Sequence, residues 1–95
     1  MQTLTFGNIN QFYRHISKMS GIVMHSKHLT NFRDVMFLYI NGCVCDRKRN
    51  LKRATELYLN MSQVDRKTID MFLDNSNSDE VIFRQSGKEF LRWKR

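Results

Sequence analysis

The sequence predicts an all-α fold, a small single-domain bundle of about five helices that spans residues 1–95. Three observations lead to this prediction. The chain has no proline and only four glycines, and prolines usually punctuate loops and sheet edges. Hydrophobic residues return at steps of three and four along most of the chain, which is the helical period. Two such patterns meet across a short junction inside Leu51–Leu73, as in a helix-turn-helix unit.

The N-terminal part of the chain changes character at Asn8. Residues 1–7 carry Leu4 and Phe6 between polar neighbours, which fits either a short flexible, extended arm or a disordered lead-in. From Asn8 to about Met24 the pattern predicts a helix, with one apolar stripe formed by Ile9, Phe12, Ile16, Met19 and Val23. Other apolar residues widen this face near the end of the helix. The wide face predicts either a partner surface or a neighbouring helix that covers it.

The next segment, Leu29–Asn41, is almost entirely apolar at its centre. Strand is the competing prediction, because the run MFLYI is short and is bounded by Asn41-Gly42. We prefer helix, because helical spacing is kept through that run by Leu29, Phe32, Met36 and Ile40. Ser26 fits either a turn or the cap of this helix, Thr30 is a second candidate cap, and Gly42 is a candidate left-handed helix stop. A helix that is apolar all round must be buried or covered by a partner.

The helix-turn-helix-like unit follows a basic loop. Asn50 is expected to cap its first helix. Ser62 is expected to cap the second helix, which would begin at about Gln63. The carboxylate of Asp65, three residues on, is expected to accept a hydrogen bond from the Ser62 amide.

The turn-forming run DNSNSD, residues 74–79, predicts the boundary before the last element. A final helix is predicted from Asp79 to about Trp93, with Ile82, Ser86, Phe90 and Trp93 on one face. Gly87 would weaken its middle by about 1 kcal/mol relative to alanine.

The charge of the chain favours an anionic partner. Its net charge is +7, with 16 basic and 9 acidic residues. One short stretch concentrates five cations, Arg47, Lys48, Arg49, Lys52 and Arg53. This stretch fits a nucleic-acid contact, an acidic protein surface, or simply a solvated loop.

Motifs for chemistry are missing from the sequence, so no enzyme is expected. There is no glycine-rich phosphate loop, no nucleophile elbow and no HExxH. Cys43 and Cys45 are one residue short of the CxxC spacing, and no HxxxH pair accompanies them, so free thiols and no metal or cofactor are expected. No apolar run is long enough for a membrane span, and no signal peptide is visible, so a cytoplasmic protein is expected.

One block of sequence resembles a known family. The run LNMSQVDRKTIDMFLDN, Leu59–Asn75, is similar to a capped helix of the AsiA-like anti-sigma factors of T-even-type bacteriophages. A looser likeness covers NIN near the N-terminus and ING at Ile40–Gly42. The resemblance implies an all-helical protein of the bacterial host cytoplasm that binds region 4 of the host primary sigma factor. It also implies inhibition of host promoter recognition, a homodimer when free, and a phage activator that joins for middle transcription.

The resemblance also implies a protein-binding face on the first two helices. The matching positions are Arg14, Lys18, Gly21, Ile22, Phe37 and Ile40. Arg14 and Lys18 depart from the family, where acidic or apolar residues are more usual.

The alternative interpretation is a small basic nucleic-acid-binding transcriptional regulator that uses the cations of residues 47–53. Reading of bases by the second helix of the Leu51–Leu73 unit is weakened by Asp65 and Asp70, because carboxylates repel phosphates. Phosphate contacts by the basic stretch do not require that helix.

Overall fold

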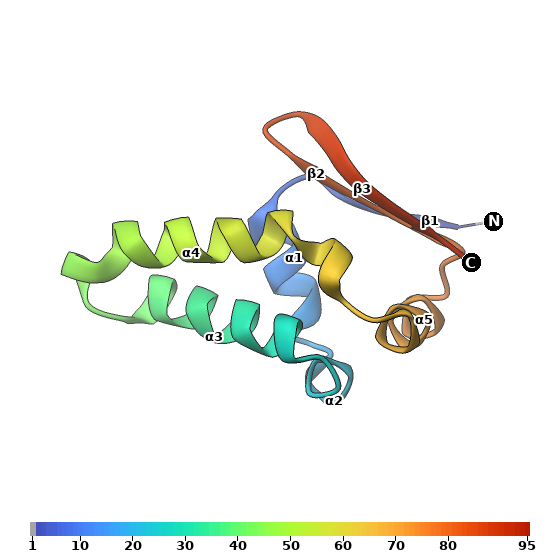
Figure 1. Ribbon diagram of the computed structural model, residues 1–95, viewed down its shortest axis with the longest axis horizontal. Helices are drawn as coiled ribbons and strands as arrows, with labels where there is room; N and C mark the ends of the chain where they lie inside the picture. The colour runs from blue at the N-terminus through green and yellow to red at the C-terminus, as the bar shows by residue number, and fades with distance from the viewer. Residues whose placement is uncertain (1) are drawn as a thin grey trace.

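The computed structural model describes residues 2–95 and shows an α+β fold, so the all-α prediction is wrong. The fold contains five α-helices and a three-stranded mixed sheet (Figure 1). In chain order the elements are β1 (Thr3–Phe6), α1 (Ile9–Ile16), α2 (Ser20–Val23), α3 (Lys27–Asn41), the 3₁₀ turn η1 (Val44–Asp46), α4 (Arg47–Leu59), the 3₁₀ turn η2 (Met61–Gln63), α5 (Arg66–Asn75), β2 (Glu80–Gln85) and β3 (Lys88–Lys94).

The predicted C-terminal helix is instead the β2–β3 hairpin. Ser86 and Gly87 form its two-residue turn, with φ of 53° and 77°. Positive φ at both central positions is the geometry of a type I′ turn, which matches the twist of the flanking strands. Val81 and Phe83 are buried on one face of β2, which is the alternation of a strand with one covered side. Gly87 therefore makes a turn and does not weaken a helix.

The N-terminal segment forms one edge strand of the sheet. The strand order is β1-β2-β3, with β1 parallel to β2 and β2 antiparallel to β3. Thr3 pairs with Glu80 and Phe6 with Phe83, so the start of the chain lies beside β2, with β3 on the other side of β2. Of the two alternatives for residues 1–7, the extended one holds for residues 3–6, and Met1 lies outside the described residues.

The first predicted helix is broken in two, yet its buried stripe is confirmed. α1 ends at Ile16, and Met19 takes a non-helical conformation with φ −121° and ψ 42° before α2 begins. The five predicted stripe residues, Ile9, Phe12, Ile16, Met19 and Val23, are all at most 7% exposed. The break thus turns the chain while both segments keep their apolar side on the core.

The second predicted helix is confirmed as α3, and so is one of its two candidate N-caps. Ser26, not Thr30, is the N-cap, and its hydroxyl accepts from the Leu29 amide at 3.2 Å. Gly42 ends the helix with φ −87°, so the left-handed conformation predicted for it is wrong. A glycine is required there for space, because a Cβ at this position would lie 2.4 Å from the Leu38 carbonyl oxygen.

The helix-turn-helix-like unit is looser than predicted. α4 begins at Arg47 with Asp46 as N-cap, so neither the basic loop to Asn50 nor an Asn50 cap is present. Ser62 lies in η2 and makes no cap; Asp65 caps α5 instead, accepting from the Thr68 amide at 3.1 Å. Residues 60–65 separate the two helices, so the junction is not the tight turn that was expected.

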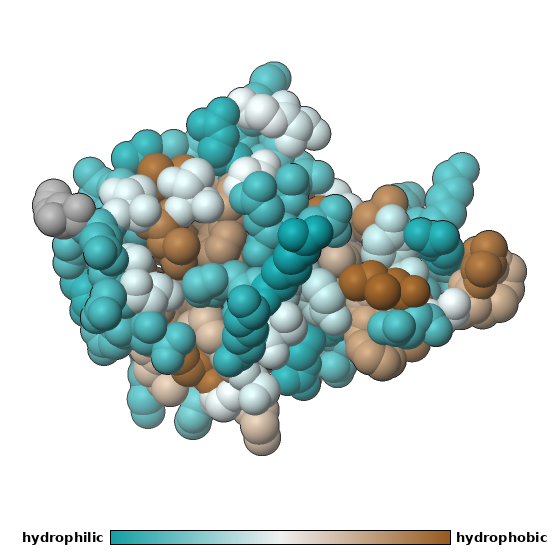
Figure 2. All heavy atoms as spheres, turned by 180° about the vertical axis from the view of Figure 1, so that it is seen from behind, coloured by the Kyte–Doolittle hydropathy of each residue, from teal (hydrophilic) through white to brown (hydrophobic). Residues whose placement is uncertain are grey.

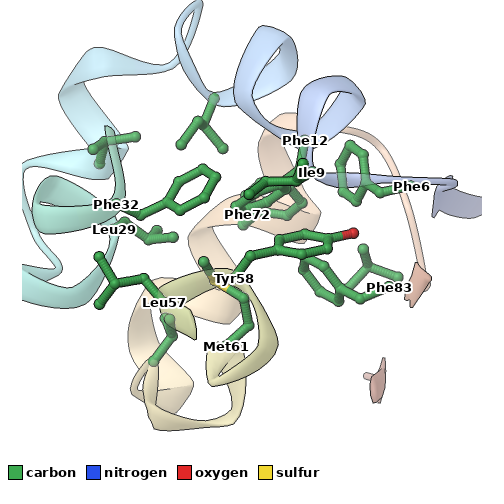
Figure 3. Packing of buried hydrophobic residues seen from close by; sticks show 14 of the residues in the cluster. Phe6, Ile9, Phe12, Leu29, Phe32, Leu57, Tyr58, Met61, Phe72 and Phe83 are labelled. Carbon is green, nitrogen blue, oxygen red and sulfur yellow. The ribbon is translucent and has the colours of Figure 1, made fainter. Parts of the chain in front are cut away.

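The core is an aromatic cluster between the helices and one face of the sheet (Figure 3). Tyr58 of α4 is fully buried beside Phe12, Phe32 and Phe83, at ring centroid distances of 5.7, 6.1 and 6.0 Å. Its hydroxyl donates a 2.8 Å hydrogen bond to the carbonyl of Arg84. The core therefore ties α1, α3 and α4 to β2.

The α3–α4 hairpin projects from this core (Figure 1). Its two helices are antiparallel neighbours, and the molecule measures 44 × 29 × 20 Å along its principal axes. No residue between Met36 and Ala54 is buried. The outer half of the hairpin consequently lies beyond the core.

Candidate interaction surface

The outer half of the α3–α4 hairpin, residues 37–53, is called here the hairpin tip. It contains the end of α3, the turn η1 and the first half of α4. Across the two helices, the Arg47 guanidinium lies over the ring of Tyr39, 5.3 Å from its centroid. This cation–π contact links the two helices at the tip, where no residue is buried.

Large apolar side chains are exposed at the hairpin tip. Phe37, Leu38 and Ile40 are 56%, 50% and 52% exposed, and Val44 at the turn is 79% exposed. Hydrophobic colour gathers at the projecting end of the molecule in Figure 2. Single exposed apolar residues are ordinary, but a cluster on a projecting element is typical of an interaction site.

Cations are concentrated on the α4 part of the hairpin tip. Arg49 pairs with Asp46 at 3.0 Å, and Arg53 lies 3.9 Å from Glu56. Lys48 and Lys52 have no ion-pair partner among residues 2–95. A shallow hollow on the outer side of α4 is lined by Cys45, Lys48, Arg49, Leu51, Lys52, Thr55, Glu56 and Leu59. The tip thus combines apolar surface with positive charge that the chain itself does not neutralise.

The two cysteines lie at the end of the tip, exposed and free, as predicted. Hydrogen bonding by the Cys45 side chain lowers the pKa of the Cys43 thiol, and the same bond, together with the Asp46 charge, raises the pKa of Cys45. The first proton therefore leaves Cys43 more readily than it leaves an ordinary cysteine. The sequence spacing alone did not indicate that Asp46 lies beside both thiols.

The structure divides the predicted protein-binding residues between two regions. Arg14, Lys18 and Gly21 are exposed near the α1–α2 break, and Ile22 is half-buried against the core. Phe37 and Ile40 belong to the hairpin tip instead.

The first of these regions lies at the opposite end of α3 from the tip. α2 is tied to the start of α3, where the Thr30 hydroxyl donates to the Val23 carbonyl at 3.0 Å. About ten residues of helix, roughly 15 Å, separate that contact from Ile40. The six predicted residues therefore do not form one continuous face.

The five predicted cations do come together, because all lie on α4 within the hairpin tip. Sequence reasoning missed Leu38 and Val44 as part of the same surface. The signal was present for Leu38, because a helix that is apolar all round must expose some apolar residues unless it is enclosed. What could not be read from the pattern is that only the first half of α3 is enclosed, by α1, α2 and α4.

The fold and this surface define a small α+β protein that presents a projecting helical hairpin. No family model, curated protein or solved structure matches the chain. Among residues 2–95, no helix is both long and apolar enough to cross a membrane.

Proposed function

We propose that the protein is a binding protein, not an enzyme, that docks its hairpin tip on an apolar groove rimmed by acids on a protein partner. The observation that carries the proposal is the coincidence, on one projecting element, of exposed Phe37, Leu38 and Ile40 with the unpaired cations Lys48 and Lys52. Apolar anchors supply affinity in such interfaces, and complementary charge supplies orientation and association rate.

The first partner to test is region 4 of the host primary sigma factor. This choice rests only on the sequence likeness of Leu59–Asn75 to AsiA-like anti-sigma factors. The fold does not add to it, because the all-helical fold that the likeness implied is wrong. On this proposal the protein acts in the bacterial cytoplasm, inhibits host promoter recognition and co-activates phage middle transcription together with a phage activator. A homodimer of the free protein would use the same exposed tip.

The test is a pull-down against RNA polymerase holoenzyme and isolated sigma region 4, followed by titration of whichever binds. Phe37→Asp and Ile40→Asp should each weaken binding at least about tenfold, since each places a charge at an apolar anchor. Met24→Asp is the matched control, because Met24 is 75% exposed at the C-cap of α2, away from the tip. It should leave the affinity within about twofold.

Absence of binding to both forms of sigma would refute the sigma assignment. Equal loss with Phe37→Asp and Met24→Asp, or no loss with either, would refute the hairpin tip as the docking surface for any partner that the pull-down recovers. Circular dichroism of each variant keeps these outcomes separate from unfolding.

A second candidate, a nucleic-acid-binding regulator, is favoured by the unneutralised Lys48 and Lys52 on the outer side of α4. It predicts affinity for DNA or RNA that falls steeply with salt and falls again in the Lys48→Gln, Lys52→Gln double variant. Phe37→Asp should then have little effect beyond its charge. Base reading by α5 is disfavoured, because Asp70 pairs with Arg66 at 3.1 Å and removes one of its two N-terminal cations from phosphate contact.

A further inference from the structure

Three side chains with metal-ligating atoms converge at the turn that ends the hairpin tip. One donor atom from each of Cys43, Cys45 and Asp46 lies within 4.8 Å of the other two. The backbone explains this convergence. The Asp46 amide donates to the Cys43 carbonyl at 3.0 Å, which closes a 3₁₀-type turn. Residues three apart in such a turn lie above one another, so Cys43 and Asp46 share a side.

The spacing of these donors suits a tetrahedral ion. Zn²⁺ binds thiolate sulfur at about 2.3 Å and carboxylate oxygen at about 2.0–2.2 Å, so neighbouring donors of one ion lie about 3.3–3.8 Å apart. The donors of the turn need only small side-chain rotations to reach that spacing. Their exposure also leaves an open path from solvent, so an ion can enter without unfolding the hairpin.

From this geometry we propose that Cys43, Cys45 and Asp46 form a three-ligand Zn²⁺ site at the end of the hairpin. Two thiolates select a thiophilic ion over Mg²⁺ or Ca²⁺, and the carboxylate oxygen suits Zn²⁺ better than Cu⁺. Binding releases the two thiol protons to solvent. With three protein ligands, the fourth position is left to a water molecule, as in open zinc sites.

Arg49 holds the third ligand in place. Its guanidinium Nη2 lies 3.0 Å from Oδ1 of Asp46 in an ion pair, which restricts the orientation of the carboxylate. Partners of this kind commonly fix metal ligands. Asp46 occupies the N-cap position of α4, but its side chain makes no hydrogen bond to the helix. Its substitution therefore tests the site without removing a helix cap.

The test uses the full chain, reduced and stripped of metal, with Co²⁺ as a spectroscopic probe and Zn²⁺ as competitor. One Co²⁺ per chain should bind, with a thiolate-to-cobalt charge-transfer band and the visible bands of tetrahedral cobalt, and one equivalent of Zn²⁺ should abolish them. Cys43→Ser and Cys45→Ser should each remove the charge-transfer signal or lower affinity at least about a hundredfold. Asp46→Asn should lower affinity about tenfold or more.

His25→Ala is the matched control, because His25 is an exposed ligand type remote from the turn, and it should leave the titration unchanged. Absence of the bands in the wild-type chain would overturn the proposal, and so would bands that persist in the double serine variant. A stoichiometry of one ion per two chains would also overturn it, since the ion would then bridge two copies. The titration contains no partner, so its outcome is independent of the proposed docking function.

Discussion

At the scale of single residues, the hydroxyl of Tyr58 is the polar atom on which the aromatic core depends. Burial raises the pKa of Tyr58 well above its usual value, so the hydroxyl stays protonated as donor to the Arg84 carbonyl. Tyr58→Phe keeps the ring and leaves that carbonyl without its donor. We expect a loss of about 1–2 kcal/mol in the free energy of unfolding, measured by urea denaturation. Tyr39→Phe, on the half-exposed side of α3, should change it by less than about 0.5 kcal/mol.

A second single residue, His15, makes the free energy of unfolding depend on pH. Its ring packs between Phe6 and Phe72, at centroid distances of 5.2 and 5.4 Å. Burial, with a smaller contribution from Lys18, lowers the pKa of His15 below its ordinary value of 6.5. The unfolded chain therefore takes up a proton near pH 6.5 before the folded chain does.

The contribution of His15 to the free energy of unfolding should consequently be greatest above pH 6.5 and should fall as pH drops through that value. Denaturant midpoints measured between pH 8 and pH 5 check this. His15→Gln should flatten the part of the decline that begins near pH 6.5, while His25→Gln should not. An identical pH profile in both variants would contradict the assignment.

At the scale of elements, the start of α5 separates two candidate caps. Asp65 accepts from the Thr68 amide, and hydrogen bonding by the Thr68 side chain, followed by that amide, lowers the pKa of its carboxyl group. Ser62, three residues earlier, is exposed in η2 and makes no cap. Asp65→Ala should therefore destabilise the protein by about 1 kcal/mol, and Ser62→Ala by less than about 0.5 kcal/mol. Thermal unfolding of the two variants gives the comparison, and a reversed order would place the cap where the sequence pattern put it.

Elements whose partners are local were predictable, and those with distant partners were not. α3 follows from the spacing of Leu29, Phe32 and Met36 within one segment. β1 has four residues and becomes a strand only through pairing with Glu80–Phe83. No local pattern contains that information.

The β2–β3 hairpin was missed for a different reason. Ile82, Ser86 and Phe90 are spaced as in a helix, so the periodicity was ambiguous. The dipeptide Ser86-Gly87 was the arbitrating signal, because Gly next to Ser between two apolar runs is typical of a hairpin turn.

At the scale of the whole molecule, the candidate surface depends on where the core ends, which only the packing shows. Phe37 and Ile40 were predicted as contacts, and the cations of α4 as a cluster, but their union on one projecting tip follows from the absence of buried residues between Met36 and Ala54. Arg14 and Lys18 lie elsewhere because α2 packs at the other end of α3.

The same division between core and tip predicts how the chain can be reconnected. Thr3 and Lys94 lie on either side of Glu80 in the sheet, so about 10 Å separates them across two strand spacings. A Gly/Ser linker of about six residues can join Arg95 to Gln2. New termini between Gly42 and Cys43 would fall at the exposed turn of the tip, where no buried residue lies nearby.

This permutant should keep the far-ultraviolet circular dichroism of the parent and a cooperative urea transition, with a loss of no more than about 2 kcal/mol, because cuts at exposed loop tips spare the core. A permutant opened between Ser62 and Gln63 should lose more, because Met61 and Val64 on either side are 0% and 5% exposed. The new linker brings β1 closer along the chain to β2 and β3, but the cut places α3 and α4 at opposite ends of it, so no faster refolding is expected. If both permutants unfold equally, the hairpin tip belongs to the cooperative core, and its exposed residues serve stability before binding.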